Sequence, residues 1–543
     1  MTAVLAPSPA PAPSRSAGAL AGTGGLVRLA LRADRWTIAV WAVAVAYLVR
    51  TSVVGFAALY PDAQARQARA TLMSSPAATA LGGPGYGLDD YTTGAMTANE
   101  LGLWIMLPVA IMAVLAVTRH LRAAEEDGRL ELVRSQPVGR SAPVVAGLVA
   151  AAVATLAVGA ATFALLLTTE LDPAGSALLC AGVVVAALVL ASAAAVGAQL
   201  VGHARTANGV GMGLVGVAFV LRAVGDVQAP ESGSLWSWLS PFGWSQATAP
   251  YVLDRWWPLL LGVAAVAVNL AVAFALVSRR DLGTGLLPER AGRATGRLGG
   301  LAGLTWRRQR TSILAWGVAT ALCGALIGLL ADAVVEFAAS DPQVLQLFGE
   351  TDDVLDGAFA VYAVFLGVLA AAYAGTAVGA ARADESSGRA AVLLALPVAR
   401  TRWLGAQLAV AVAAVLLMLL AAGLLMGGSA AATLGDADQV ARLTGAVLVT
   451  APAALLVLGL AVLVLGAWPR AFPLVWAYVA YVGVMGMFAA VLPDGADLLS
   501  PFRYLPRLPA EGMDPGAVLA VTALAVALGS AGLVAFRRRD TLA

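Results

Sequence analysis

The side chains of this sequence that could do chemistry gather in a short charged motif and in its repeat. The motif contains Glu125, Glu126, Gly128, Arg129 and Pro137. Its carboxylates and guanidinium groups can form charge-assisted hydrogen bonds, within the chain or with a partner protein. Because proline ends helices, the motif predicts a short helix that presents charge to a partner in the cytosol. One copy alone could equally be a solvated basic loop.

The same motif recurs 260 residues later without a gap, in the pattern R-A-x-E-x-x-G-R-x7-P-V-x-R. The matching residues of the second copy are Glu385, Gly388, Arg389 and Pro397. Leu-Ser-Pro-Phe occurs at 239–242 and again at 499–502, and Arg-Arg-Asp occurs at 279–281 and 538–540. Three motifs that return in the same order indicate a duplicated chain, with both halves in one orientation.

Enzymatic chemistry finds little support in the residue types. The two histidines, His120 and His203, show neither the spacing of a Ser–His–acid triad nor that of metal ligands. All 34 basic residues are arginine. A phosphate-binding loop of the form G-x-x-x-x-G-K-[ST] requires its lysine, so we expect this chain to bind no ATP in that way, and no metal or other cofactor.

Long apolar runs must position these motifs. The sequence is 60% hydrophobic and only 12% charged, and a helix that crosses a bilayer needs about 20 mainly apolar residues. We therefore predict an all-α polytopic membrane protein with about twelve spans. The predicted spans lie near 36–58, 101–119, 143–168, 177–201, 207–224, 257–278, 311–335, 356–381, 404–427, 441–466, 471–492 and 514–536.

The arginines also predict the orientation and the division of the chain. Most of them fall on one side of the predicted membrane, together with both termini, and the positive-inside rule makes that side cytoplasmic. The motifs predict two six-span halves, 25–281 and 307–543, joined by a cytoplasmic linker at 282–306. Residues 1–24 are rich in Ala, Pro and Ser and predict a disordered cytoplasmic tail.

The repeated motif resembles the first cytoplasmic loop of type-2 ATP-binding-cassette permeases, which carry E-x-x-G-x8-P between spans 2 and 3. Leu-Ser-Pro-Phe before the last span of each half also resembles that family. The resemblance covers nearly the whole chain, because each half shows it once. The chain as a whole is similar to fused double permeases of actinobacteria that export polyketide antibiotics and other drugs. It implies that both loops dock on a separate ATPase subunit, present in two copies, which binds ATP and Mg²⁺.

In such exporters the substrate cavity lies between spans 2 and 5 of each half, so the resemblance directs attention to aromatic and polar residues of those spans. In the predicted spans near 356–381 and 471–492 these residues recur on one helical face. The candidates are Asn208, Met212, Phe219, Tyr362, Phe365, Tyr373, Tyr478, Tyr481, Met485 and Phe488. Ordinary packing between helices would explain the same pattern. If they line a cavity, aromatic rings and methionine suit hydrophobic substrates of varied shape.

A secondary transporter of the major facilitator kind is the main alternative, because it also has six plus six spans. Its motif between spans 2 and 3 has a different spacing of glycine, acid and basic pair. Proton-coupled transport also commonly uses carboxylates within the membrane, and the predicted spans carry none near their centres. These features favour a bacterial inner-membrane exporter driven by ATP.

Overall fold

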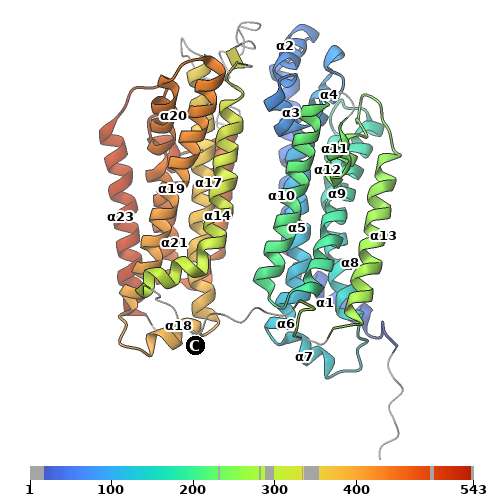
Figure 1. Cartoon of the computed structure of the whole chain (residues 1–543), viewed down its shortest axis with the longest axis vertical. Coiled ribbons are helices and arrows are strands. Elements are labelled where there is room, and N and C mark those ends of the chain that lie inside the picture. The colour runs from blue at the N-terminus through green and yellow to red at the C-terminus, as the bar shows by residue number, and fades with distance from the viewer. Residues whose placement is uncertain are drawn as a thin grey trace, which may run out of the picture. The chain divides into compact units, whose positions relative to one another are not determined.

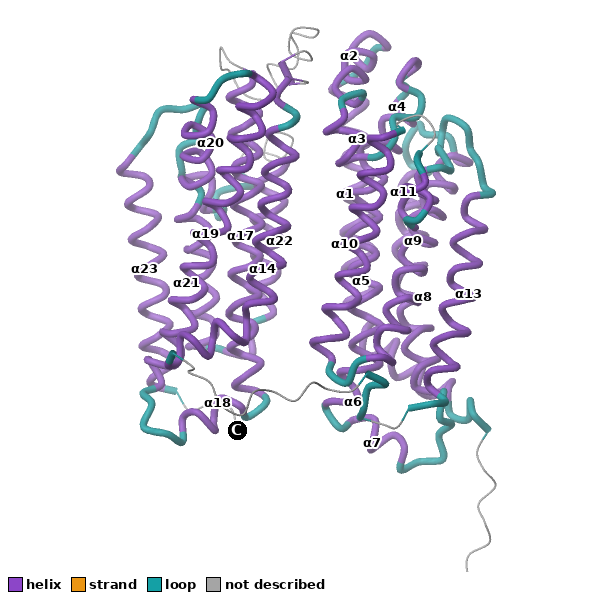
Figure 2. The backbone as a smooth tube through the Cα atoms, viewed as in Figure 1, coloured by secondary structure: helices purple, strands orange, loops and turns teal. Residues whose placement is uncertain are grey.

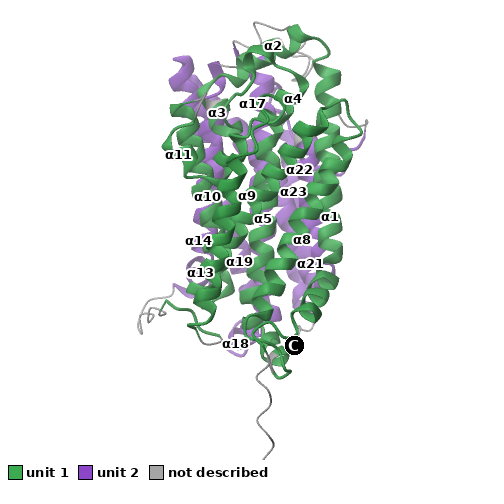
Figure 3. Cartoon of the chain, turned by 90° about the vertical axis from the view of Figure 1, so that its right-hand side faces the viewer, with its two compact units in different colours: residues 1–292 green, residues 293–543 purple. Residues whose placement is uncertain are grey.

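The computed structural model of the chain describes residues 18–229, 233–280, 283–287, 299–332, 334–335, 354–488 and 495–539. Within these ranges the chain forms helices, turns and loops and no strand (Figure 2). It divides into two compact units, Met1–Gly292 and Arg293–Ala543 (Figure 3). The predicted all-α membrane fold is therefore confirmed.

The first unit contains six long helical spans and several short helices (Figure 1). Its long helices are α1 (Thr23–Leu59), α5 (Gly102–Thr118), α8 (Ala142–Leu166), α9 (Pro173–Leu200), α10 (Ala204–Gln228) and α13 (Pro258–Val277). Its short helices are α2 (Ala63–Met73), α3 (Pro76–Gly82), α4 (Thr93–Met96), α6 (Ala124–Glu126), α7 (Arg129–Arg134), α11 (Leu235–Trp238) and α12 (Pro241–Gln246). The short α7 lies at the opposite end of this bundle from α2 and α3.

The second unit repeats this order. Its helices are α14 (Gly300–Gly328), α17 (Val354–Ser386), α18 (Arg389–Leu394), α19 (Arg400–Leu434), α20 (Asp438–Val449), α21 (Ala451–Ala467), α22 (Pro473–Phe488) and α23 (Pro515–Arg538). The helices α20 and α21 together form one span. A 3₁₀ turn, η7 (Pro501–Tyr504), precedes α23.

Eleven helices of the described chain are long and apolar enough to cross a membrane. They correspond to eleven of the twelve predicted spans. The remaining prediction, near 471–492, coincides with α22, which has 16 residues, and residues 489–494 lie outside the described part. Aspartates followed by proline begin two of the spans: Asp172 accepts a hydrogen bond from the backbone of Gly175, and Asp514 caps α23 in the same manner.

The spans of each unit pack in the same order. In the first unit α9, the fourth span, contacts α5, α8, α10 and α13, whereas α1 packs on α8. In the second unit the fourth span, α20–α21, contacts α17, α19, α22 and α23, whereas α14 packs on α19. The fourth span is consequently well enclosed: 67% of the most apolar window of α9 is buried, the same share as in the second span, against 17% for α13.

Glycines allow the closest of these contacts. A Cβ atom added at Gly466 of α21 would lie 2.2 Å from the carbonyl oxygen of Gly532 of α23, and one at Gly459 would lie 2.6 Å from that of Ala525. Real side-chain carbons do not approach backbone atoms so closely. Small residues at such interfaces let two helix backbones approach each other, which increases van der Waals contact within a membrane.

Two predicted boundaries need correction. The predicted tail, 1–24, ends in an ordered segment, because the backbone amide of Gly139 donates to Ala21 and that of Ser141 donates to Ala19. The predicted linker, 282–306, is partly helical from Gly300 onward. Its described part at 283–287 also pairs with the end of α9 by backbone hydrogen bonds. Residues 1–17 lie outside the described part.

Candidate coupling site

The repeated motif lies where the second span of each unit ends. In the first unit the span continues from α5 through a π-helix, Arg119–Ala123, into α6, and then stops at Gly128. In the second unit α17 runs on to Ser386 before Gly388. Both glycines have positive φ, 71° and 74°, with no neighbouring atom near an added Cβ. The left-handed backbone, and not lack of space, therefore favours glycine in the motif.

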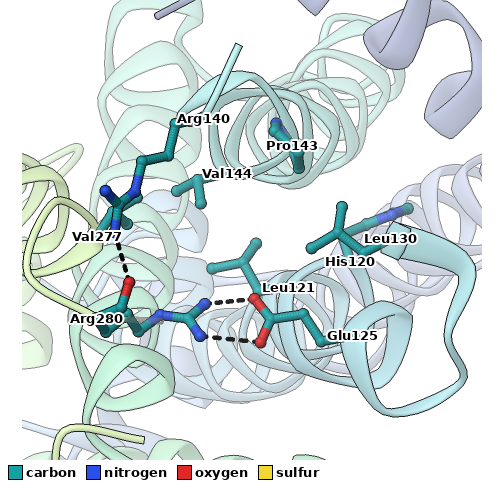
Figure 4. A pocket seen from close by; sticks show the side chains of 9 residues that line it. All are labelled: His120, Leu121, Glu125, Leu130, Arg140, Pro143, Val144, Val277 and Arg280. Carbon is teal, nitrogen blue, oxygen red and sulfur yellow. Dashed lines mark hydrogen bonds and ion pairs between the residues drawn. The ribbon is translucent and has the colours of Figure 1, made fainter. Parts of the chain in front are cut away.

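Glu125 is the centre of a buried ion cluster in the first unit (Figure 4). Both amino groups of the Arg280 guanidinium bind its carboxylate, one of them at 2.9 Å. Arg140 donates to the backbone carbonyl of Arg280 at 2.5 Å. Gln199 accepts from Nε of Arg280 at 2.6 Å. The cluster thus joins the end of the second span to the end of the sixth, beside the loop that carries Pro137.

The second unit builds the same cluster from the repeated positions. Arg539 donates to Glu385 at 2.7 Å, and Arg400 donates to the backbone carbonyl of Arg539 at 2.5 Å. We call each set the Glu–Arg–Arg cluster: Glu125, Arg280 and Arg140 in the first unit, and Glu385, Arg539 and Arg400 in the second. The two motifs that recur separately in the sequence therefore meet in space, once in each unit.

One prediction about these loops is wrong. We expected the motif acids to present charge to the cytosol, but the side chains of Glu125 and Glu385 are 6% and 1% exposed and are neutralised within their own unit. Glu126 also turns back, because it accepts a hydrogen bond at 3.0 Å from the backbone of Ala204 at the start of α10. Glu125 and Glu385 therefore position the loop, whereas Glu126 is exposed and forms its outer surface together with other residues.

Exposed side chains on the short helices form that outer surface. Leu132 of α7 is 75% exposed, and Val392 of α18, the same position in the repeat, is 72% exposed. Arg129 is exposed as well and pairs with Asp127 at 2.8 Å. Arg389 lies 3.3 Å from the carboxylate of Asp384. Pro137 and Pro397 are exposed in the turns that follow these helices.

The surroundings of the two clusters differ. In the first unit Arg122 is fully buried and binds Glu125 together with the carbonyls of Ala198 and Thr284. Its counterpart Arg382 is half-buried and lies over the ring of Phe472 at 5.3 Å. The first unit thus surrounds its glutamate with two guanidinium groups, and both of them also donate to the carbonyl of Thr284 in the linker.

In both units an ion pair joins the first and second spans, but the acid and the base have exchanged places between the two units. In the first unit the acid is on the first span, where Asp34 accepts from Arg119 at 2.7 Å and lies 2.6 Å from Nε2 of His120. In the second unit the base is on the first span, where Arg308 binds Asp384 with both amino groups. Each pair joins neighbouring spans beside the Glu–Arg–Arg cluster.

Residues 298–537 match a family described as "Multidrug efflux system permease Rv1217c, C-terminal domain". A protein of Mycobacterium tuberculosis, "Multidrug efflux system permease protein Rv1217c", is 35% identical to the chain over 531 residues, which cover 96% of this chain and 95% of that protein. The chain belongs to this permease family. The similarity to exporter permeases inferred from the repeated motif is thereby confirmed.

The structure of this permease gives several predicted cavity residues another role. The hydroxyl groups of Tyr478 and Tyr481 donate to the backbone carbonyls of Leu499 and Ala496 at 2.9 and 2.7 Å, and their rings stack. They thus hold the segment that carries the second Leu-Ser-Pro-Phe motif against α22. Tyr373 is fully buried in the core of the second unit, and its role in substrate binding stays a prediction.

The other cavity candidates lie on α10 of the first unit and on α17 and α22 of the second. Met212 is exposed on α10, and Asn208 and Phe219 are half-buried on the same helix. Tyr362 and Phe365 pack against the core of the second unit. Met485 is half-buried on α22, and the side chain of Phe488 lies outside the described part. Their role in substrate binding stays a prediction.

A buried ion pair of the permease that was not predicted from the sequence lies at the opposite end of the first unit. Arg222 of α10 is fully buried, lies 3.5 Å from Asp226, and donates to the carbonyls of Thr79 and Ala80 at the end of α3. Asp226 accepts from Ser237 of α11 at 2.6 Å. The spacing of four residues between Arg222 and Asp226 was the signal available. This pair ties α3 and α11 to α10.

The segment between α1 and α5 contains a second ion pair. Arg69 of α2 binds Glu100 at 2.8 Å, and the hydroxyl of Tyr91 donates to the same carboxylate at 3.3 Å. Burial, and then the charge of Glu100, raise the pKa of Tyr91 well above its usual value. Tyr91 therefore remains a hydrogen-bond donor at neutral pH. Residues 59–99, between the first two predicted spans, consequently form an ordered structure that is attached to the second span.

Proposed function

We propose that the chain is the permease of an ATP-driven efflux system of the bacterial inner membrane, with both termini in the cytoplasm. A separate ATPase, in two copies, binds ATP and Mg²⁺ and docks on α7 and α18. The exported compounds are hydrophobic drugs, antibiotics or similar lipid-like molecules. Full-length similarity to a multidrug efflux permease supports the transport role, and the distribution of arginines supports the orientation.

The ATPase proposal rests on a connection, present in both units, between a short helix with an exposed side chain and two membrane spans. Each unit has an exposed aliphatic side chain on a short helix, Leu132 or Val392. A Glu–Arg–Arg cluster joins the base of that helix to the second and sixth spans. A partner that moves the short helix would therefore move two spans at once. Coupling of this kind requires a discrete link that a partner can bias.

The proposal is tested by purifying the tagged chain from its own host and measuring ATP hydrolysis. The preparation with its copurifying subunits should hydrolyse ATP, and the chain separated from them should not. Leu132→Asp and Val392→Asp should each reduce recovery of the ATPase at least fivefold, because a carboxylate would have to be desolvated at the docking surface. Gln136→Asp, which adds the same charge at an exposed site in the same loop, is the matched control.

Two results would contradict the proposal. ATP hydrolysis by the separated chain would show that it carries its own ATPase site. Drug efflux that persists without any ATPase and collapses when the proton gradient is removed would instead identify a secondary transporter of the major facilitator kind.

A further inference from the structure

Three arginines form one exposed face at the start of α1. Arg28, Arg32 and Arg35 are all exposed, and with 3.6 residues per turn they fall within an arc of about 60°. Arg28 and Arg32 form no hydrogen bond or ion pair with the described part of the chain, and Arg35 contacts only the ring of Trp36, at 5.7 Å. This face therefore has a high density of unneutralised positive charge.

The acidic residue of the same helix segment is turned away from that face. Asp34 is buried and binds Arg119 and His120 of the second span. Its direction on the helix is more than 90° from those of the three arginines. The helix thus places its negative charge against the bundle and its positive charges outside. An anionic ligand would meet no repulsion from Asp34.

An apolar stripe begins beside the arginine face and runs along α1, centred about 80° around the helix from the three arginines. Trp36, Val40, Val43 and Tyr47 are each more than 60% exposed, and their spacing of four, three and four residues aligns them. Charged groups at one end and an apolar stripe along the helix match the two parts of an anionic lipid. Guanidinium groups bind phosphate with two parallel hydrogen bonds, and Trp is favoured where headgroups meet acyl chains.

The first span of the second unit also carries exposed arginines and an exposed apolar face. Arg307 and Arg310 occupy the positions of Arg32 and Arg35 in the repeat, and both are exposed. Leu314, Val318 and Leu322 continue the exposed face at intervals of four residues. The neighbouring Arg308 is turned inward to bind Asp384. Both first spans thus turn one charge toward the bundle and two arginines outward.

We propose that the outer face of each first span binds one anionic phospholipid. Its phosphate lies between Arg32 and Arg35 in the first unit, or between Arg307 and Arg310 in the second, and one acyl chain lies along the apolar stripe. The lipid thus covers one face of the first span. The same span is ion-paired to the second span, beside the loop that carries the repeated motif. Binding of the lipid therefore stabilises the first span against its bundle.

Native mass spectrometry of the purified protein tests this with phosphatidylglycerol and with phosphatidylcholine of the same acyl chains. The wild-type protein should retain two phosphatidylglycerol molecules under conditions that remove phosphatidylcholine. Arg32→Gln/Arg35→Gln and Arg307→Gln/Arg310→Gln should each lose one of them. The matched control, Arg537→Gln/Arg538→Gln, removes two exposed arginines from the end of α23 and should retain both.

Thermal unfolding supplies a second readout. Phosphatidylglycerol should raise the Tm of the wild-type protein above its value in phosphatidylcholine, and each site variant should lose about half of that increase. In phosphatidylcholine the variants should unfold at the wild-type Tm, which shows that they fold.

Several outcomes would overturn the proposal. An equal loss of lipid from the Arg537/Arg538 control would reduce the effect to net charge. Displacement of the lipid by millimolar inorganic phosphate would show that the acyl stripe contributes nothing. Tighter binding of an oligoglutamate peptide than of phosphatidylglycerol would make the face a protein-docking surface. Equal retention of the two lipids would show that the arginines do not recognise the headgroup.

Discussion

At the scale of single residues, burial decides what the charges of this permease do. Glu385 and Arg539 pair where the glutamate side chain is 1% exposed, whereas Asp127 and Arg129 pair where both side chains are about 60% exposed. Loss of one partner from a buried pair leaves an uncompensated charge, which costs about 3–5 kcal/mol. An exposed pair contributes about 0–1 kcal/mol.

A double-mutant cycle can measure this difference. Glu385→Gln and Arg539→Gln should each lower the free energy of unfolding by about 3–5 kcal/mol. The double variant should lose less than their sum, with a coupling energy of about 0.5–3 kcal/mol. The same cycle on Asp127→Asn and Arg129→Gln should show about 0–1 kcal/mol. Similar coupling energies in both cycles would contradict the structural role of the buried cluster.

Hydroxyl groups can be tested separately from aromatic rings. Tyr481→Phe removes the oxygen that binds Ala496 and Leu499 and keeps the ring. We expect a loss of about 0.5–1.5 kcal/mol in unfolding free energy and a changed drug-resistance profile, because the segment at 495–500 would lose its anchor. Tyr47→Phe, on the exposed face of α1, is the control. If only Tyr481→Ala alters resistance, the ring itself contacts substrate.

At the scale of helices, close backbone approach determines which glycines can be replaced. Gly466→Ala would place a methyl group 2.2 Å from a carbonyl oxygen of α23. Overpacking of this kind costs about 1–3 kcal/mol, so we expect a lower Tm and weaker association of α21 with α23. Gly405→Ala in α19 meets no atom within 4 Å, and should be neutral or slightly stabilising because alanine favours helix. Equal Tm values for the two variants would contradict the packing argument.

At the scale of the whole molecule, the two units share the order of their helices and the Glu–Arg–Arg cluster, but the contacts around the two clusters differ. Arg122 is buried among Glu125, Ala198 and Thr284, whereas Arg382 rests on an aromatic ring. Duplication explains the shared plan. Separate substitution since then has made the first unit more tightly connected to the segment that leads into the linker.

This asymmetry predicts unequal effects of one substitution at matched positions. Arg122→Met should cost about 3 kcal/mol, the low end for a broken buried pair, because Glu125 keeps Arg280. Arg382→Met should cost about 0.5–1 kcal/mol, the size of a cation–π contact at a partly exposed site. Unfolding and drug efflux of both variants provide the measurement. Equal losses would show that the two units carry equivalent connections.

Local properties of the chain were enough to predict the membrane fold. Apolar runs of about 20 residues have few stable arrangements other than helices that cross the bilayer, and eleven of the predicted spans have the required length and hydropathy. The recurrence of Glu125 and Gly128 at Glu385 and Gly388 also indicated two loops of the same local conformation. A left-handed glycine between two helices depends on only a few neighbouring residues.

Tertiary structure alone decided which of these residues face each other. Glu125 and Arg280 are 155 residues apart, and they meet because the second and sixth spans end side by side around α9. The partners of Tyr481 likewise depend on how the segment before α23 folds back. Charge and hydrogen-bonding capacity can be read from each residue, but burial and pairing depend on the packing of helices that are distant in the chain. For that reason Glu125, which the sequence placed on a solvated surface, belongs to the buried link between the loop and the spans.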